Sequence, residues 1–483
     1  MGRWRVFAHG EENGDVEGLP DALRSVLVSA RGRVRREREP FLLSPDGVPD
    51  AVINDFFRSL GPGGALSELS ARTYAYSIAT YCNLLAEVGA DWRSADPYDF
   101  GRVRDLRRFG DETHPLVAGS TWQKDFQAIR ELYRWAAGFG IVSPIVPRAS
   151  FMRSQPGAAD FVRSSDVKWF TPAAVAFWAD VGLRGLLPDS VEASSFRGHN
   201  SQRDSAFASV LFRTGLRVQE AGNLLLGVEL LENPGGRRFV TSRVASALAK
   251  GGRGRKFWMP VSCVSEVGAY VWGERARSVG QARARGVYDD LGRGWLFVSD
   301  VSGGVVRWRD GAGRVGKGAV DMLGAAVRRR LLVRVDGEWE PMMVWVTDEG
   351  SPLSHQRWNA VFRRANARVL ALGAQVSPVK PHHLRHSFAL RWFAVGKLLW
   401  MGRTAGLEAR ERARLRDEMP SEWFLVQTLL GHRNVETTRN TYLEPFADLD
   451  IELLMAHAED ESTSALLAHF LSRDPRVEIM GAF

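Results

Sequence analysis

The feature that most constrains the fold of this 483-residue chain is a proline-containing segment, PIVPRASFMRSQPG, at residues 144–157. Its three prolines and its lack of a helical period are typical of a linker. A helical pattern precedes the segment, and a mixed pattern of helices and strands follows it. A chain of this length is also expected to hold two or three domains. We therefore predict two main domains joined by a linker at residues 144–165.

Before the linker, apolar residues recur at helical spacing from residue 49 onward. The predicted helices span residues 51–60, 71–89, 97–109 and 121–137, with Ser70 as the N-cap and Gly89 as the end of the second helix. Together they predict an all-helical domain at residues 49–143.

Residues 1–48 are expected to form an N-terminal arm or extension. Their Arg-rich run at residues 31–38 fits a solvated helix face or flexible arm better than a phosphate contact.

After the linker, the pattern predicts a second domain at residues 166–446, with two insertions and a C-terminal tail. A β-hairpin with a basic, Gly-rich tip is expected at residues 237–261, because β-branched residues flank Gly251 and Gly252. Predicted helices cover residues 171–182, 201–215, 217–227, 354–372, 382–399 and 421–430, and the insertions cover residues 280–345 and 401–420. The tail at residues 447–483 holds two short amphipathic stretches. The expected fold class is mainly α with a small β-sheet or hairpin (α+β).

Composition narrows the class of protein. An apolar fraction of 45% with 25% charged residues is that of a globular protein, which excludes wholesale disorder and fibrous repeats. The sequence contains no run of about 18 apolar residues, so we expect no membrane-spanning helix, and its first residues lack the apolar core of a signal peptide. Cys82 and Cys263 are the only cysteines, which excludes a disulfide scaffold and favours a cytoplasmic location. The net charge of +8 favours a polyanionic partner only weakly, because the chain is rich in Arg, Ala and Gly throughout.

Four short strings stand out in the second half: TGLRVQE, AKGG, PHHLRHSFA and LLGHRNVETTRNTY. Each has an ordinary interpretation when taken alone. The three histidines of HHLRH resemble a metal cluster, but they lack a nearby carboxylate or Cys at ligand spacing, so the sequence does not favour a zinc site.

Taken together and in this order, the strings resemble the tyrosine recombinase (phage integrase) family. His382 and Arg385 fit the His-x-x-Arg motif of that family, and Tyr442 follows His432 by ten residues, a spacing that the family uses. The resemblance covers about residues 50–450, because the first helical region is similar to the family's core-binding, DNA-clamping domain. It implies a core-binding domain followed by a tyrosine-recombinase catalytic domain. The two insertions and the longer hairpin depart from the compact members and look like larger integrases of mobile elements.

The resemblance implies a chemistry for six residues. Tyr442 would attack a DNA phosphodiester and form a 3′-phosphotyrosine, which preserves the bond's free energy for rejoining. Arg217 and Arg385 would clamp the phosphate oxygens, and His432 would add a hydrogen bond there. His382 would act as the base or its orienting partner. Lys250, on a flexible hairpin tip, would protonate the leaving 5′-oxygen, with Lys256 as the second choice.

Other residues are expected to assist. Glu220 would orient Arg217, although a solvent-exposed Glu is an equal alternative. Candidate DNA contacts are Lys124, Arg130, Arg255 and Lys256; for the helix that carries Lys124 and Arg130, a core role with a hydrated outer face is equally weighted. No metal or other cofactor is expected, since Arg217, Arg385 and Lys250 would neutralise the phosphate and no nucleotide-binding loop is evident.

The resemblance therefore implies a site-specific DNA recombinase for integration or excision of a mobile element. Its partners would be double-stranded DNA, three further copies in a tetramer and an accessory directionality factor, with no membrane. The alternatives are a type IB topoisomerase-like enzyme and a catalytically inactive DNA-binding relative. The C-terminal tail is expected to dock on a neighbouring protomer, with packing on its own domain as the alternative.

Overall fold

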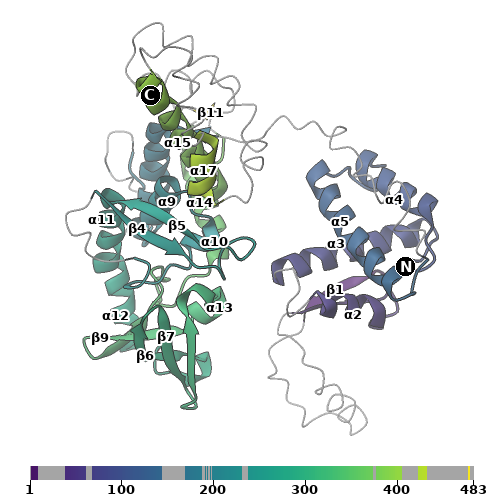
Figure 1. The fold of residues 1–483 in the computed structure, drawn as a ribbon, viewed down its shortest axis with the longest axis horizontal. Coiled ribbons are helices and arrows are strands. Elements are labelled where there is room, and N and C mark those ends of the chain that lie inside the picture. The colour runs from purple at the N-terminus through teal and green to yellow at the C-terminus, as the bar shows by residue number, and fades with distance from the viewer. Residues whose placement is uncertain are drawn as a thin grey trace. The chain divides into compact units, whose positions relative to one another are not determined.

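The computed structural model describes residues 2–8, 39–60, 68–143, 169–187, 198–230, 238–373, 377–404, 422–431 and 477–478, together with residues 191, 193 and 196. The chain divides into two compact units, Met1–Arg163 and Ser164–Phe483, each of which is described by itself (Figure 1). Within the described ranges, no helix is long and apolar enough to cross a membrane. The Arg-rich run at 31–38, the expected linker at 144–165 and residues 405–420 of the second insertion lie outside the described residues.

The first unit is helical. Its elements are β1 (Arg5–Ala8), β2 (Pro40–Leu43), α2 (Ala51–Ser59), α3 (Glu68–Glu87), α4 (Pro97–Phe109) and α5 (Gly119–Gly138). The strands β1 and β2 pair antiparallel, and the side chain of Leu42 is fully buried in the core of this unit. Trp4, just before β1, donates its backbone N–H to Oδ1 of Asn83 on α3 at 2.8 Å. The described part of residues 1–48 therefore packs onto the helices.

The four helices of this unit lie where the periodicity predicts them. Asp50 caps α2 by accepting from the N–H of Ile53 at 2.9 Å, and Asp96 caps α4. The predicted N-cap Ser70 is wrong: α3 begins two residues earlier, at Glu68, so Ser70 lies inside the helix. Gly89 follows the end of α3 with a φ of +82°, a backbone conformation that glycine adopts at no steric cost.

The second unit is α+β, which confirms the predicted fold class. Its helical elements are α8 (Pro172–Trp178), α9 (Ser201–Thr214), α10 (Val218–Ala221), α11 (Val261–Tyr270), α12 (Ala276–Ala284), α13 (Ala325–Arg328), α14 (Trp358–Ala371), α15 (Pro381–Thr404) and α17 (Glu422–Leu430), with π-helical turns at Ala179–Arg184 and Val271–Arg275 and 3-10 turns η4 (Leu291–Arg293), η5 (Val320–Met322) and η6 (His355–Arg357). Its strands are β3 (Trp169–Phe170), β4 (Phe239–Val244), β5 (Arg255–Pro260), β6 (Leu296–Ser302), β7 (Val305–Asp310), β8 (Val315–Ala319), β9 (Leu331–Val335), β10 (Glu338–Pro341) and β11 (Val477–Glu478).

The core of this unit centres on aromatic side chains from α9, α14 and the segment before α14. Phe207 stacks on Trp358 with ring centroids 3.5 Å apart, and Trp345 meets both rings edge-on. All three side chains are fully buried. This packing fixes α9, and with it the loop that follows α9, against the rest of the unit.

The predicted hairpin is confirmed as the antiparallel pair β4–β5. In Figure 1 it lies between the helices α9, α15 and α17 and a larger sheet that contains β6, β7 and β9. The prediction of a helix across residues 217–227 is wrong beyond Ala221, because Leu225 pairs with Met343 and Leu226 donates its N–H to the Met342 carbonyl.

The segment 280–345, which looked irregular in sequence, contains a five-stranded sheet in the order β10-β9-β6-β7-β8. Its alternation is clear only in the structure: Val306 is buried whereas Arg307 and Arg309 are exposed. A buried ion pair anchors this sheet, since Arg328 donates to both oxygens of Glu229 at 2.7 and 3.0 Å. The glycines and exposed Arg residues of this segment interrupt the alternation of apolar and polar residues, so the strands could not be predicted from the sequence.

The tail is described only at β11, which pairs in parallel with β3 through Val477–Trp169 and Glu478–Phe170. The two amphipathic stretches of the tail, at residues 448–457 and 462–470, lie outside the described residues.

Candidate functional site

Four of the six residues expected to carry chemistry lie in described parts of the second unit: Arg217, Lys250, His382 and Arg385. His432 and Tyr442 lie outside the described residues. The site can therefore be built from four segments: the α9–α10 loop, the hairpin loop, the start of α15 and the end of α17.

Arg217 is presented by a tight turn between α9 and α10. Gly215 ends α9 with a φ of +65°, and its N–H donates to the Leu211 carbonyl at 3.1 Å. Arg217 then begins α10, where its N–H donates to Oε2 of Glu220 at 2.8 Å and its Nη1 donates to Oε1 at 2.9 Å. The side chain stays 26% exposed, so the guanidinium is oriented but still accessible.

Glu220 is the buried centre of this arrangement, with a side chain only 1% exposed. The alternative of a solvent-exposed Glu is therefore wrong. Burial alone would raise the pKa of this carboxyl, but the hydrogen bonds and charge of Arg255, with the charges of Arg385 and Arg217, outweigh it and lower the pKa to about 2.

Arg255 has a different place from the DNA contact predicted for it. Its two Nη atoms donate to the two oxygens of Glu220 at 2.8 and 2.6 Å, and its side chain is 9% exposed. It lies in phase with the buried Phe257 and Met259 on β5. An Arg on the apolar face of a predicted strand was the sequence signal for this internal role, and the sequence analysis missed it.

Arg385 joins three of the four segments. It lies in the second turn of α15, is 1% exposed, and donates Nη1 to the Gly215 carbonyl and Nη2 to the Leu430 carbonyl, the latter at 2.7 Å. The neighbouring Phe388 packs so closely on Gly215 that a Cβ there would lie 2.4 Å from its ring.

His382 lies in the first turn of α15, with its ring centroid 4.2 Å from that of His386. Partial burial of the imidazole and the charges of Arg385, Arg217 and Lys250 lower the pKa of His382 to about 4. These three cations come from distant parts of the sequence and all act on one ring. The structure thus brings together the four predicted residues that it describes.

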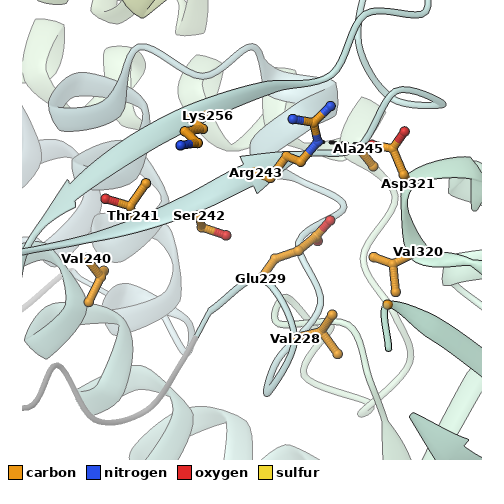
Figure 2. Close-up of a pocket in the computed structure, with 11 residues that line it drawn as sticks. Val228, Glu229, Val240, Thr241, Ser242, Arg243, Ala245, Lys256, Val320 and Asp321 are labelled. Carbon is orange, nitrogen blue, oxygen red and sulfur yellow. Dashed lines mark hydrogen bonds and ion pairs between the residues drawn. The ribbon is translucent and has the colours of Figure 1, made fainter. Parts of the chain in front are cut away.

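Lys250 lies in the loop between β4 and β5, beside Gly251 and Gly252, which have φ values of +76° and +70°. The lysine is exposed, while the preceding Leu248 and Ala249 are buried and anchor the loop in the core. Lys256, the second choice for the same role, follows Arg255 on β5. Because successive side chains of a strand point to opposite faces, Lys256 is directed away from the Glu220–Arg255 pair. It lines a cavity of about 470 Å³ together with Thr241, Ser242 and Arg243 of β4 (Figure 2).

The three histidines of α15 do not form a metal cluster in the structure. His383 stacks on Phe170, with centroids 5.8 Å apart, and its Nδ1 accepts from the Lys380 N–H at 3.3 Å. Among the residues that the structure describes, no group of three or more His, Cys, Asp or Glu side chains could hold a metal ion.

In the first unit, the two predicted DNA contacts on α5 differ in their surroundings. Lys124 is exposed. Arg130 is half-buried, donates to Oε1 of Gln127 and lies 5.8 Å above the Phe126 ring. The opposite face of α5 is core, with Trp122 and Ile129 buried.

Comparison with known proteins gives one family match. Residues 53–138 match the family model described as the phage integrase N-terminal SAM-like domain, a range that includes α3, α4 and α5. Two solved structures of the XerH site-specific recombinase also align. The post-cleavage complex with palindromic difH substrate has 14% identity and a TM-score of 0.47, covering 82% of this chain and 81% of that chain. The pre-cleavage complex with difH substrate has 13% identity and a TM-score of 0.41, covering 79% of each. Comparison with curated proteins finds no match.

Proposed function

We propose that this chain, a member of the tyrosine recombinase family with a phage integrase SAM-like domain at residues 53–138, is a site-specific recombinase that cuts and rejoins DNA through a 3′-phosphotyrosyl intermediate. Integration or excision of a mobile element would be its role, and double-stranded DNA its substrate.

The observation that carries this proposal is that the fold brings these residues to one place. Arg385 donates to the Gly215 carbonyl, two residues before Arg217. Burial, together with the charges of Arg385, Arg217 and Lys250, also lowers the pKa of His382. Three cations gathered around one point are suited to a substrate that brings negative charge. In a phosphoryl transfer, charge develops on the non-bridging oxygens, and each preorganised donor there can lower the barrier by about 3 kcal/mol. Arg217 and Arg385 would supply these donors.

Tyr442 would be the nucleophile. Its hydroxyl oxygen bonds to phosphorus while the bond from phosphorus to the 5′-oxygen breaks, and the electron pair of that bond stays on the 5′-oxygen. The new ester retains the free energy needed for rejoining, so no nucleotide is consumed. His432 would bind the same phosphate. Support for its placement comes from Gly431, which directly precedes it and lies against Arg255: a Cβ on Gly431 would be 2.2 Å from Arg255 Cδ.

Two protons must move in this reaction. With a pKa of about 4, His382 is neutral at neutral pH and can accept the proton of the tyrosine hydroxyl. A bound phosphodiester would offset the surrounding positive charge and raise this pKa, so the base would become stronger when substrate is present. Lys250, which is exposed on its loop, would give its proton to the 5′-oxygen.

DNA affinity would come mainly from phosphate contacts. The net charge of +8 and the exposed Lys124 on α5 support such contacts. We also propose that the protein acts as a tetramer on two synapsed sites. Because the exchange of a phosphodiester for a phosphotyrosine is nearly balanced in free energy, an accessory factor would set the direction of recombination.

The test uses duplex fragments of the DNA that flanks the gene, each labelled and incubated with wild-type protein or with Tyr442→Phe. The wild type should form a protein–DNA adduct that survives a denaturing gel, and the variant should bind the same fragment in a gel shift without forming it. An adduct from Tyr442→Phe would refute the assignment of the nucleophile. Adduct formation with relaxation of supercoiled DNA, but without strand exchange between two sites, would favour the topoisomerase alternative. A wild-type protein that binds DNA and never forms an adduct would be the inactive relative.

A further inference from the structure

The inserted sheet contacts the hairpin loop that carries Lys250. The contact is made by η5, the 3-10 turn that directly follows β8. Asp321, in the middle of this turn, accepts the Ser246 N–H at Oδ1 over 3.0 Å, and its backbone carbonyl accepts the Ala247 N–H, also at 3.0 Å. One residue thus binds two successive amides at the start of the loop.

The other end of the loop is tied to the same point. The N–H of Gly254 donates to Oγ of Ser246 at 3.1 Å. A Cβ on Gly254 would lie 2.9 Å from this Oγ and 3.0 Å from Oδ1 of Asp321, so only glycine permits the close approach. Arg243, at the end of β4, adds a longer contact from Nε to Oδ1 at 3.5 Å, and Figure 2 shows the two side chains directed toward each other beside the cavity.

The turn that holds the loop is itself fixed to the segment that carries Arg217. Arg328, which is fully buried, donates to the carbonyls of Val320 and Leu323 on either side of Asp321, both at 2.8 Å. The same guanidinium donates to the carbonyl of Asn223, just beyond α10, at 3.0 Å. A continuous set of hydrogen bonds therefore connects α10, the turn η5 and the Lys250 loop.

We propose that Asp321 is a positioning residue, which holds the loop of residues 245–254 so that Lys250 can reach the leaving 5′-oxygen of the cleaved strand. The five-stranded insertion then acts as a brace for the catalytic hairpin. This inference rests on the proposed function, in which the ammonium of Lys250 gives its proton to the 5′-oxygen. The hydrogen bonds from Ser246, and to a lesser degree Arg243, also lower the pKa of Asp321, so the acceptor stays ionised at neutral pH.

The first measurement tests the brace without DNA. Hydrogen exchange of the full chain should show faster exchange at residues 245–254 in Asp321→Ala than in wild type, with unchanged exchange in β5 and α9. Asp321→Asn keeps an oxygen to accept from Ser246 and should resemble wild type. Asp300→Ala is the matched control, because Asp300 is an exposed aspartate of the same sheet that pairs with Arg307 at 2.7 Å. Unchanged exchange of the loop in Asp321→Ala would overturn the proposal.

The second measurement links the brace to proton transfer. A flanking-DNA fragment cleaved by the wild type is resynthesised with sulfur in place of the bridging 5′-oxygen, since a thiolate leaves without needing a proton. Asp321→Ala should cleave the oxygen substrate more slowly, on the order of tenfold or more, and the sulfur substrate at nearly the wild-type rate. Asp321→Asn and Asp300→Ala should cleave both substrates as the wild type does.

Lys250→Ala separates the two ways of failing. If sulfur restores Lys250→Ala but not Asp321→Ala, the positioning role is refuted while the proposed function stands. If the sulfur substrate restores cleavage by neither variant, Lys250 is not the acid of the proposed function, and the predicted effect of Asp321 on proton transfer is refuted as well. The hydrogen-exchange measurement then decides separately whether Asp321 holds the loop.

Discussion

Glu220 binds Arg255 through both carboxylate oxygens, at 2.8 and 2.6 Å, while the same carboxylate orients Arg217 at 2.9 Å. One buried anion thus connects the hairpin strand β5 to the turn that presents Arg217. Removing one partner of such a pair leaves the other buried and uncompensated, which is strongly destabilising. Glu220 therefore connects the hairpin to the turn between α9 and α10, in addition to orienting Arg217.

The first prediction concerns Glu220→Gln and pH. The pKa of Glu220 falls from 4.5 to about 2 on folding, so its stabilisation is fully present above pH 4.5 and is lost as the pH falls through about 2. The difference in free energy of unfolding between wild type and Glu220→Gln should therefore shrink by up to about 3 kcal/mol between pH 5 and pH 2. Urea unfolding, followed by tryptophan fluorescence at several pH values, measures it.

Glu266→Gln is the control for this experiment. Glu266 pairs with Arg213 at 3.2 Å, but both side chains are about one-third exposed, so the pair should contribute less than about 1 kcal/mol at any pH. A Glu220→Gln difference that stays constant with pH would contradict the low pKa.

The second prediction concerns the turn before Arg217. Gly215→Ala forces a side chain onto a residue with a φ of +65° and into the ring of Phe388, so unfolding should become easier by about 2 to 4 kcal/mol. Gly373→Ala is matched to it, since Gly373 also follows a helix end, with a φ of +77°, but has open space around it. That variant should lose only about 1 kcal/mol. Equal losses of unfolding free energy in the two variants would show that the Phe388 side chain moves aside. The packing of Phe388 on Gly215 would then not fix the turn.

The third prediction concerns metal ions. Arg217, Lys250 and Arg385 bring positive charge to the place where His382 stands, which is the charge that a metal ion would otherwise supply. Adduct formation on flanking DNA should therefore continue at an unchanged rate in EDTA. Loss of the adduct in EDTA, with recovery when Mg²⁺ is added, would count against the proposed mechanism.

The fourth prediction separates two parts of the tail. Ending the chain after Arg476 removes β11, which pairs with β3 in the same chain, so this variant should show easier unfolding of the second unit. Ending it after Phe446 also removes the amphipathic stretches at 448–457 and 462–470, which we propose dock on a neighbouring protomer. Only the longer truncation should lose cooperative filling of paired half-sites in a gel-shift titration, while still binding a single half-site. Cooperative filling by the longer truncation would exclude docking between protomers, and its failure to fold would favour packing within one chain.

Local patterns in the sequence were sufficient for most helices and for the hairpin. The period of residues 97–109 predicts α4 with its observed bounds, because helix periodicity depends on neighbouring residues alone. Ordered strings in the sequence also predicted that Arg217, Lys250, His382 and Arg385 belong to one site. In the structure, the charges of the other three residues all act on the His382 ring, so the fold brings the four together. The five-stranded sheet could not be predicted from the sequence, because β6 pairs with β9 as well as with β7. Pairing between strands that are distant in the sequence leaves only a weak local period, which glycines and arginines interrupt.

What the sequence determined by itself is the set of chemical groups, because the type and order of residues such as Arg217 and Arg385 are written in the chain. What the tertiary structure decided is which charges are paired. Arg255 and Lys256 are adjacent cations in the sequence, yet the pleat of β5 directs the first to Glu220 and the second to the far face of the hairpin. Asp321 reaches Ser246 only because the inserted sheet folds back onto the hairpin. Burial and hydrogen-bond partners depend on contacts between distant segments, so the difference between a surface cation and an internal one arises only when the chain is folded.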